Sequence, residues 1–206
     1  MRLRGKFQSL KPLPIQQQTA LASHAGGLFI ASMNLNLQST DFELFGLPER
    51  FAQDRAAIDA RWKELQREAH PDRFAAQGAA AQRVAMQWSV RINEAYQRLK
   101  DPLRRAAYLC ELRGASINAE NNTAMPAAFL IEQMEWREAL DEAAGEADLE
   151  VLDEQLKRSR SDVLRHIEQL LDEQADPAAA AQQVRALMFI ERFGQDVQAR
   201  FEQLGQ

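Results

Sequence analysis

The stretch "REAHPDRFA", residues 67–75, decides how the rest of the chain is interpreted. It reads as the end of a charged helix that runs into a proline, with His70 before Pro71 and Asp72 after it. Proline has no N–H to donate and disfavours helical backbone in the preceding residue, so the helix is expected to end here. The tripeptide could serve as an acid–base pair, a metal site, a turn or a docking loop.

The rest of the sequence gives little support to catalysis or metal binding. The only other histidines, His24 and His166, lie in no recognisable constellation, and the chain has no Gly-rich phosphate loop, nucleophile elbow or helix-borne histidine pair. One His and one Asp make a poor metal site without further ligands. The single cysteine, Cys110, excludes a multi-cysteine site. We therefore expect no enzymatic activity, no catalytic residue, no metal and no cofactor.

Composition and charge exclude two further classes. Of the 206 residues 46% are hydrophobic and 27% charged, which is typical of a globular protein, and no apolar run is long enough to span a membrane. Residues 115–206 hold 8 basic against 19 acidic side chains, and so much negative charge repels nucleic acid. A lone cysteine fits a reducing compartment. The expectation is a cytoplasmic protein that binds neither nucleic acid nor membrane.

Helical periodicity runs through the chain from Asp41 onward. "TDFELFGLP" predicts a short helix capped by Thr40 or Asp41, and "DRAAIDARWKELQREAH" predicts a longer one that begins at Asp54. After the predicted loop "PDRFAAQG" comes a third helix whose apolar stripe comprises Val84, Trp88, Ile92, Ala95 and Leu99. A further short helix ends at Gly114. We expect Trp62, Trp88, Trp136 and Cys110 to be core residues.

The second half predicts a small helical bundle. Residues 115–124 are polar and rich in turn formers, which places a boundary there, and three amphipathic helices follow: residues 126–144, Asp148 to about Glu173, and a last helix that begins after Pro177. The expected organisation is a leader over residues 1–38, a unit over 39–113, a linker over 114–124 and a bundle over 125–206. The acid-poor leader resembles a transit peptide, but it lacks amphipathic periodicity. A disordered leader, or a start placed too far upstream of Met33, is the favoured interpretation.

The first helix of the predicted bundle has two apolar faces. Phe129, Gln133, Trp136 and Leu140 share one face. Leu130, Ile131 and Met134 lie on roughly the opposite face, with Glu138 and Glu142 nearby. A bundle helix needs only one apolar stripe to build its core. The second stripe either packs on another helix or stays exposed as an interaction patch, and the residues alone leave both open.

The order of these features resembles a known domain. A short helix closed by "FGLP", a charged helix, His-Pro-Asp, a loop and a helix containing "INEAYQRLKDP" are similar to the J-domain, from about Asp41 to Asp101. The segments "DPLRRAAYLCELRG", "AAFLIEQMEWREALDEA" and "VRALMFIERF" resemble the HscB family, the co-chaperones of bacterial iron–sulfur cluster assembly. The Gly/Phe-rich segment and cysteine repeats of general J-proteins, and the cysteine-rich N-terminal segment of some eukaryotic relatives, have no counterpart here.

This resemblance implies an all-α fold, in which a J-domain (an antiparallel helical hairpin with a His-Pro-Asp loop) is joined to a C-terminal three-helix bundle. It implies that the protein stimulates the ATPase of the DnaK-type chaperone HscA and delivers to it the cluster scaffold IscU. The chaperone-binding residues would be His70, Pro71, Asp72, Arg73, Lys63 and Arg67, although the residues alone allow Lys63 and Arg67 to be an ordinary solvated face. The scaffold-binding residues would be Leu130, Ile131, Met134, Glu135, Glu138, Glu142 and Phe189.

Two alternatives remain at this stage. One is a general J-domain co-chaperone that serves a different client. The other is a helical binding module in which His-Pro-Asp is only a turn, because proline between two helices is ordinary turn chemistry and Asp72 could organise the turn by accepting from nearby backbone amides.

Overall fold

The computed structural model describes residues 36–117, 125 and 127–204. Within these ranges all regular structure is helical and no β-strand occurs, which confirms the predicted fold class. The expectations for residues 1–35 and 118–124 lie outside the described residues. None of the helices in the described part of the chain is long and apolar enough to cross a membrane.

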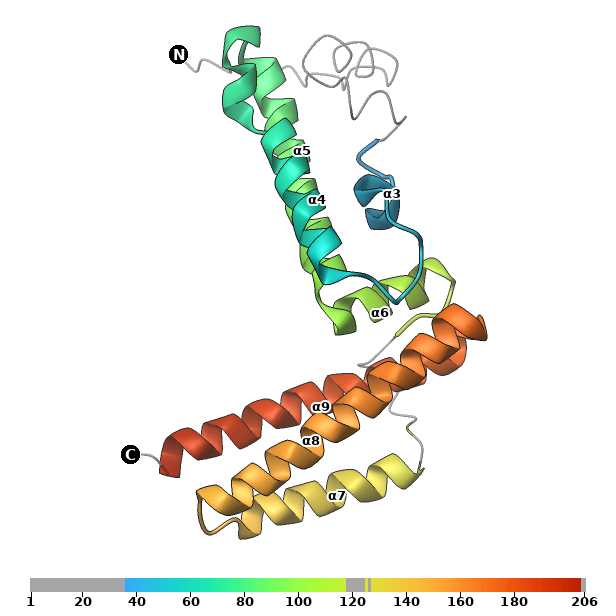
Figure 1. The fold of residues 1–206 in the computed structure, drawn as a ribbon, viewed down its shortest axis with the longest axis vertical. Coiled ribbons are helices and arrows are strands. Elements are labelled where there is room, and N and C mark those ends of the chain that lie inside the picture. Colours follow the sequence, from blue (N-terminus) through green and yellow to red (C-terminus); the bar gives the residue numbers. More distant parts are fainter. Residues whose placement is uncertain (1–35, 118–124, 126, 205–206) are drawn as a thin grey trace, which may run out of the picture.

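An antiparallel hairpin forms the N-terminal part (Figure 1). It consists of α4 (Arg55–Glu68) and α5 (Ala79–Lys100), and Asp54 caps α4 by accepting from the N–H of Ala56, as predicted. Ile58 and Leu65 on α4 are fully buried, with Ile92 and Leu99 facing them from α5. The expectation for Val84 was wrong. Val84 is 40% exposed, because the start of α5 extends past the end of α4. The neighbouring Ala85 is the buried residue of this turn.

A short helix, α3 (Asp41–Phe45), packs against this hairpin. Thr40, rather than Asp41, is its N-cap: the Thr40 hydroxyl accepts from the N–H of Glu43, and the Glu43 carboxylate accepts from the N–H of Thr40. The helix ends at Gly46, whose φ of +63° is a left-handed conformation that favours glycine.

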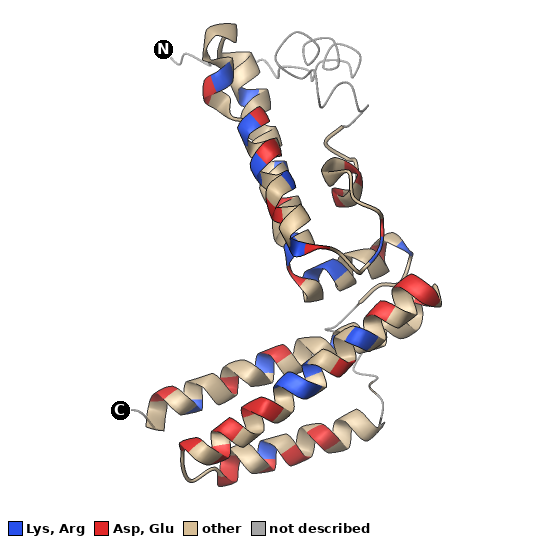
Figure 2. Ribbon diagram, viewed as in Figure 1, with Lys and Arg blue, Asp and Glu red and all other residues tan. Residues whose placement is uncertain are grey.

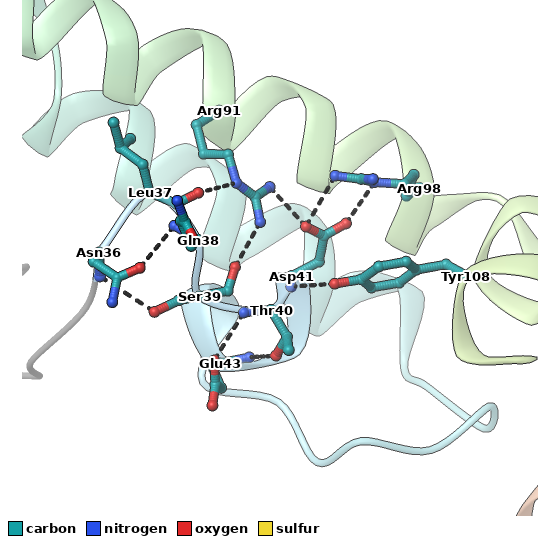
Figure 3. Close-up of polar contacts among 10 residues, drawn as sticks. All are labelled: Asn36, Leu37, Gln38, Ser39, Thr40, Asp41, Glu43, Arg91, Arg98 and Tyr108. Carbon is teal, nitrogen blue, oxygen red and sulfur yellow. Dashed lines mark hydrogen bonds and ion pairs between the residues drawn. The ribbon is translucent and has the colours of Figure 1, made fainter. Parts of the chain in front are cut away.

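Asp41 is fully buried and is the shared acidic partner of an ion-pair cluster (Figure 3). Its carboxylate lies 2.6 Å from Nη1 of Arg91 and 2.7 Å from Nε of Arg98, both on α5. Its backbone N–H donates to the hydroxyl of Tyr108 on α6 (Pro102–Leu112) at 2.9 Å. A buried charge is tolerated only when it is paired and hydrogen-bonded, so this cluster fixes α3 between α5 and α6.

The C-terminal part consists of α7 (Ala127–Glu142), α8 (Glu146–Glu168), a π-helical turn η2 (Gln169–Glu173) and α9 (Pro177–Leu204). Its core contains side chains from all three long helices, among them Phe129, Trp136, Leu156, Phe193 and Val197. The predicted second helix starts two residues earlier than expected, because the carboxylate of Asp148 reaches back to accept from the N–H of Ala144 and Gly145.

The two parts share one hydrophobic core across the predicted boundary. The end of α8, the turn η2 and the start of α9 contribute Ile167, Leu171, Val184 and Leu187 to the cluster that fills the hairpin and α6. In Figure 1 this end of α8 and α9 lies next to α6, while α7 lies on the far side. The hairpin and the bundle therefore pack against each other through a shared core.

Candidate functional site

The His-Pro-Asp loop lies at the far end of the α4–α5 hairpin and forms a tight turn. Where the sequence predicts a loop, Pro71–Gln77 form a 3₁₀ helix, η1, with His70 at its N-cap in an extended conformation (φ −65°, ψ 126°). The N–H of Asp72 donates to Nδ1 of His70 at 3.3 Å, and the N–H of Arg73 donates to the His70 carbonyl at 3.1 Å. The side chain that organises the turn is therefore that of His70, and not the Asp72 carboxylate that turn chemistry alone suggested.

Three contacts fix this loop to the hairpin. Phe74 is buried beneath it. The hydroxyl of Ser89 on α5 donates to the carbonyl of Ala69 at 3.2 Å, and the guanidinium of Arg73 donates to the carbonyl of Arg67 at 3.1 Å. The positive charge of Arg73 thus lies at the C-terminal end of α4, where the helix dipole favours a cation.

The functional groups of the loop face solvent. The side chain of His70 is 59% exposed and that of Asp72 is 90% exposed, and Nδ1 of His70 lies 3.7 Å from Oδ2 of Asp72. Lys63 and Arg67 are exposed on α4, and the ribbon of Figure 2 shows basic positions interspersed with acidic ones along this hairpin. Side chains this exposed lack the water-excluding surroundings that acid–base catalysis uses. The arrangement suits contact with another protein.

The described part of the chain contains no cluster of metal-ligating side chains, and its one thiol is buried. No group of three His, Cys, Asp or Glu side chains there is arranged to hold a metal ion. Cys110 is fully buried on α6, as predicted, and burial raises the pKa of its thiol to about 11. A thiol this weakly acidic is unreactive near neutral pH.

The second apolar stripe of α7 is exposed. Phe129 and Trp136 are buried in the bundle, whereas Leu130, Ile131 and Met134 are 45%, 59% and 71% exposed. The exposed side of the same helix carries three glutamates, Glu135, Glu138 and Glu142. We refer to these three apolar and three acidic residues together as the α7 patch. The residues alone left open whether another helix covers this stripe, and among the described residues none does.

Phe189 lies beside the α7 patch, at the edge of the bundle core. Its ring stacks on Phe193 with centroids 6.0 Å apart and meets Phe129 edge-on at 5.9 Å. The guanidinium of Arg137 on α7 covers the ring at 5.7 Å from its centroid. Phe189 is therefore half-buried in a groove between α7 and α9, and only part of its ring is accessible.

Sequence reasoning missed Arg137. It is the single basic residue of α7 and lines the groove of about 440 Å³ that runs between α7 and α9 beside Phe189. Its isolated positive charge on an otherwise acidic helix was the available signal. Because its guanidinium lies over Phe189, Arg137 borders the part of that ring that is accessible in the groove.

A second groove, between α7 and α8, was also not predicted. It has a volume of about 730 Å³, and its lining includes Phe129, Glu132, Glu135 and Asp162. Burial raises the pKa of Glu132, and the charges of Glu135 and Asp162 raise it further, while a hydrogen bond with Ser159 acts in the opposite direction. Glu135 is common to this groove and to the α7 patch.

The two exposed surfaces lie far apart on one body. In Figure 1, which is drawn with the longest axis vertical, the tip of the α4–α5 hairpin is at one end and α7 is at the other. The structure therefore brings the predicted chaperone-binding residues together at one surface and the predicted scaffold-binding residues together at a second. The two sets do not meet.

A hairpin with His-Pro-Asp between its helices, followed by a C-terminal helical domain, defines a J-domain co-chaperone. Comparison with known proteins specifies the family. Residues 125–198 match the family model of the HSCB C-terminal oligomerisation domain. The chain is 51% identical over 173 residues to the co-chaperone protein HscB homolog of Burkholderia multivorans, an alignment that covers 82% of this chain and 98% of the relative. The chain belongs to the HscB family of co-chaperones, and it is not an enzyme.

Solved structures of two relatives have the same fold. The chaperone HscB from Vibrio cholerae is 37% identical with a TM-score of 0.70, and the match covers 81% of this chain and 99% of that one. The human co-chaperone protein HscB is 26% identical with a TM-score of 0.75, and the match covers 81% and 84% of the two chains. The likeness thus extends over both the hairpin and the helical domain.

Proposed function

We propose that the protein acts in iron–sulfur cluster assembly in the cytoplasm, where it holds the scaffold IscU and delivers it to the DnaK-type chaperone HscA. HscA engages the loop of His70, Pro71 and Asp72, together with Lys63, Arg67 and Arg73. IscU binds the α7 patch and the accessible part of Phe189. Binding at both surfaces stimulates the ATPase of HscA.

The exposure of the α7 patch is the observation that carries this proposal. Three large apolar side chains lie on one exposed helix face, although a single apolar stripe already builds the bundle core. An apolar cluster rimmed by charges is typical of a protein–protein interface. Methionine suits this role, because its flexible, unbranched side chain adapts to a partner surface.

The shared core explains how two modest surfaces act together. A scaffold bound at α7 and a chaperone bound at the hairpin tip are held on one body, so the scaffold is presented to HscA at a high effective concentration. The separation of the two surfaces allows both partners to bind at once. The co-chaperone itself makes or breaks no covalent bond. It contributes by holding the scaffold close to HscA.

The test is the steady-state ATPase rate of HscA in the presence of IscU. We expect the wild type to stimulate, Asp72→Asn to abolish stimulation, and Leu130→Ala/Met134→Ala to abolish only the synergy with IscU. Val151→Ala is the matched control, because Val151 is a 61% exposed apolar residue on α8, outside the patch. If the patch variant keeps full synergy, the client is not held at α7 and the proposed function is wrong.

A further inference from the structure

His70 makes a contact that has a structural rather than a recognition role. Its Nδ1 accepts from the N–H of Asp72 at 3.3 Å, which is the contact that N-cap side chains make with the first turn of a helix. Its carbonyl accepts from the N–H of Arg73 at 3.1 Å. The carbonyl bond is the first intrahelical bond of this 3₁₀ helix, and the ring satisfies the N–H of Asp72, which has no intrahelical partner of its own.

The cap requires one tautomer of the neutral ring. Nδ1 accepts a hydrogen bond only when it carries no proton, so the neutral ring holds its single proton on Nε2. Nε2–H is then the only polar group of the imidazole that is free for another partner. The side chain of Asp72 takes no part in the cap and points its carboxylate into solvent, where it is 90% exposed.

The conformation of Asp72 therefore depends on His70. Pro71 fixes its own φ, Phe74 anchors the end of the turn in the core, and the His70 ring holds the N–H of Asp72 between them. Without the ring acceptor this N–H loses its partner and the first turn of η1 loosens. Loss of a side-chain N-cap lowers the population of the capped conformation about fivefold.

From these contacts we propose that His70 is a positioning residue in chaperone docking: its Nδ1 caps η1 and so fixes the backbone from which Asp72 presents its carboxylate. That the cap fixes the loop follows from the loop geometry alone. That the cap matters for docking on HscA rests on the proposed function. If this is so, position 70 needs a hydrogen-bond acceptor where Nδ1 lies, and it does not need an imidazole ring.

Two amide substitutions distinguish a capping role of Nδ1 from direct contact of the imidazole ring with the chaperone. Asparagine places its Oδ1 the same number of bonds from Cβ as Nδ1, and it is among the best N-cap residues. Glutamine places its acceptor one bond further out, near the position of Nε2, and cannot close the same turn. We expect His70→Asn to stimulate the HscA ATPase within about twofold of the wild type, and His70→Gln to fall at least about fivefold below it.

Two spectroscopic measurements on the free protein test the cause directly. The ring ¹⁵N shifts are expected to show the Nε2–H tautomer, and the Asp72 amide is expected to exchange slowly in the wild type and in His70→Asn but several-fold faster in His70→Gln. Asp72→Asn is the companion variant. It keeps the backbone N–H and hence the cap, so its amide at this position stays protected while stimulation is lost.

Each outcome decides the question. Slow exchange in His70→Gln, or a predominant Nδ1–H tautomer, overturns the cap. Protection in His70→Asn together with stimulation as poor as that of His70→Gln shows that the ring itself contacts the chaperone, which also overturns the inference. A wild type that does not stimulate at all refutes the proposed function instead, and the amide exchange rates still decide whether His70 fixes the loop.

Discussion

The carboxylate of Asp172 accepts a hydrogen bond from the N–H of Phe51 at 2.7 Å, although the two residues are 121 positions apart in the chain. Its second oxygen accepts from the N–H of Ala52 at 2.8 Å. Asp172 lies in the π-helical turn between α8 and α9, and Phe51 precedes α4. This one side chain therefore connects the turn of the C-terminal domain to the base of the hairpin.

We expect Asp172→Ala to destabilise the protein by about 1–3 kcal/mol, because it leaves two partly buried N–H groups without acceptors. Urea unfolding measures the change. The control is Glu173→Ala at the adjacent, exposed position, where a change below about 0.5 kcal/mol is expected. Equal free energies of unfolding for the two variants would show that the Asp172 contact adds no stability.

Asp41→Asn tests the buried ion-pair cluster of Figure 3. Removing the carboxylate leaves Arg91 and Arg98 without their shared counter-ion, and breaking a buried pair in this way costs about 3–5 kcal/mol. Glu154→Gln, which breaks an exposed pair with Lys157 on α8, is expected to cost less than about 1 kcal/mol. Similar losses in both variants would contradict the burial argument.

The α7 patch predicts binding loss without stability loss. Leu130→Ala/Met134→Ala removes exposed side chains, so the thermal midpoint is expected to stay within about 2 °C of the wild type. Binding of IscU, measured by titration calorimetry, is expected to weaken at least about tenfold. Trp136→Ala, on the buried face of the same helix, is expected to cost about 3–5 kcal/mol of stability. A large fall in midpoint for the patch variant would place these residues in the core.

Glu132 makes stability depend on pH. Burial raises the pKa of its carboxyl above the ordinary value of 4.5, so the folded protein binds this proton more tightly than the unfolded chain does. The free energy of unfolding therefore falls as the pH rises from about 4.5 through the raised pKa, and the loss is absent below that window.

Glu132→Gln removes the charge and with it this dependence. We expect the variant to be more stable than the wild type at about pH 7, with the difference vanishing near pH 4. Chemical denaturation at the two pH values measures it, and exposed Glu150→Gln on α8 serves as the control. A variant that is no more stable than the wild type at neutral pH would show that the charge of Glu132 is not disfavoured by its surroundings.

The sequence predicted the parts of this molecule that local chemistry determines. Caps such as Asp54, the break at Pro71 and the two faces of α7 follow from residue types and helical spacing alone. The exposure of Val84 did not follow, because periodicity identifies a face but not where its partner helix ends. The contact of Asp172 with Phe51 was equally out of reach, since it depends on how two distant segments meet.

The same limit applies to the candidate sites. His70 and the α7 stripe could be identified from sequence, but the cap made by Nδ1 of His70 needed the turn geometry. The position of Arg137 over Phe189 needed the packing of α9 on α7. A contact between two helices depends on how they pack, so the local sequence around either residue does not predict it.

The most direct test of the account is a mixing experiment on the HscA ATPase with IscU present. Asp72→Asn keeps the scaffold surface and Leu130→Ala/Met134→Ala keeps the chaperone surface, so an equimolar mixture contains both surfaces on separate molecules. We expect the mixture to show no synergy beyond that of the two variants measured singly, because delivery requires both surfaces on one body. A mixture that restores the wild-type rate would contradict it.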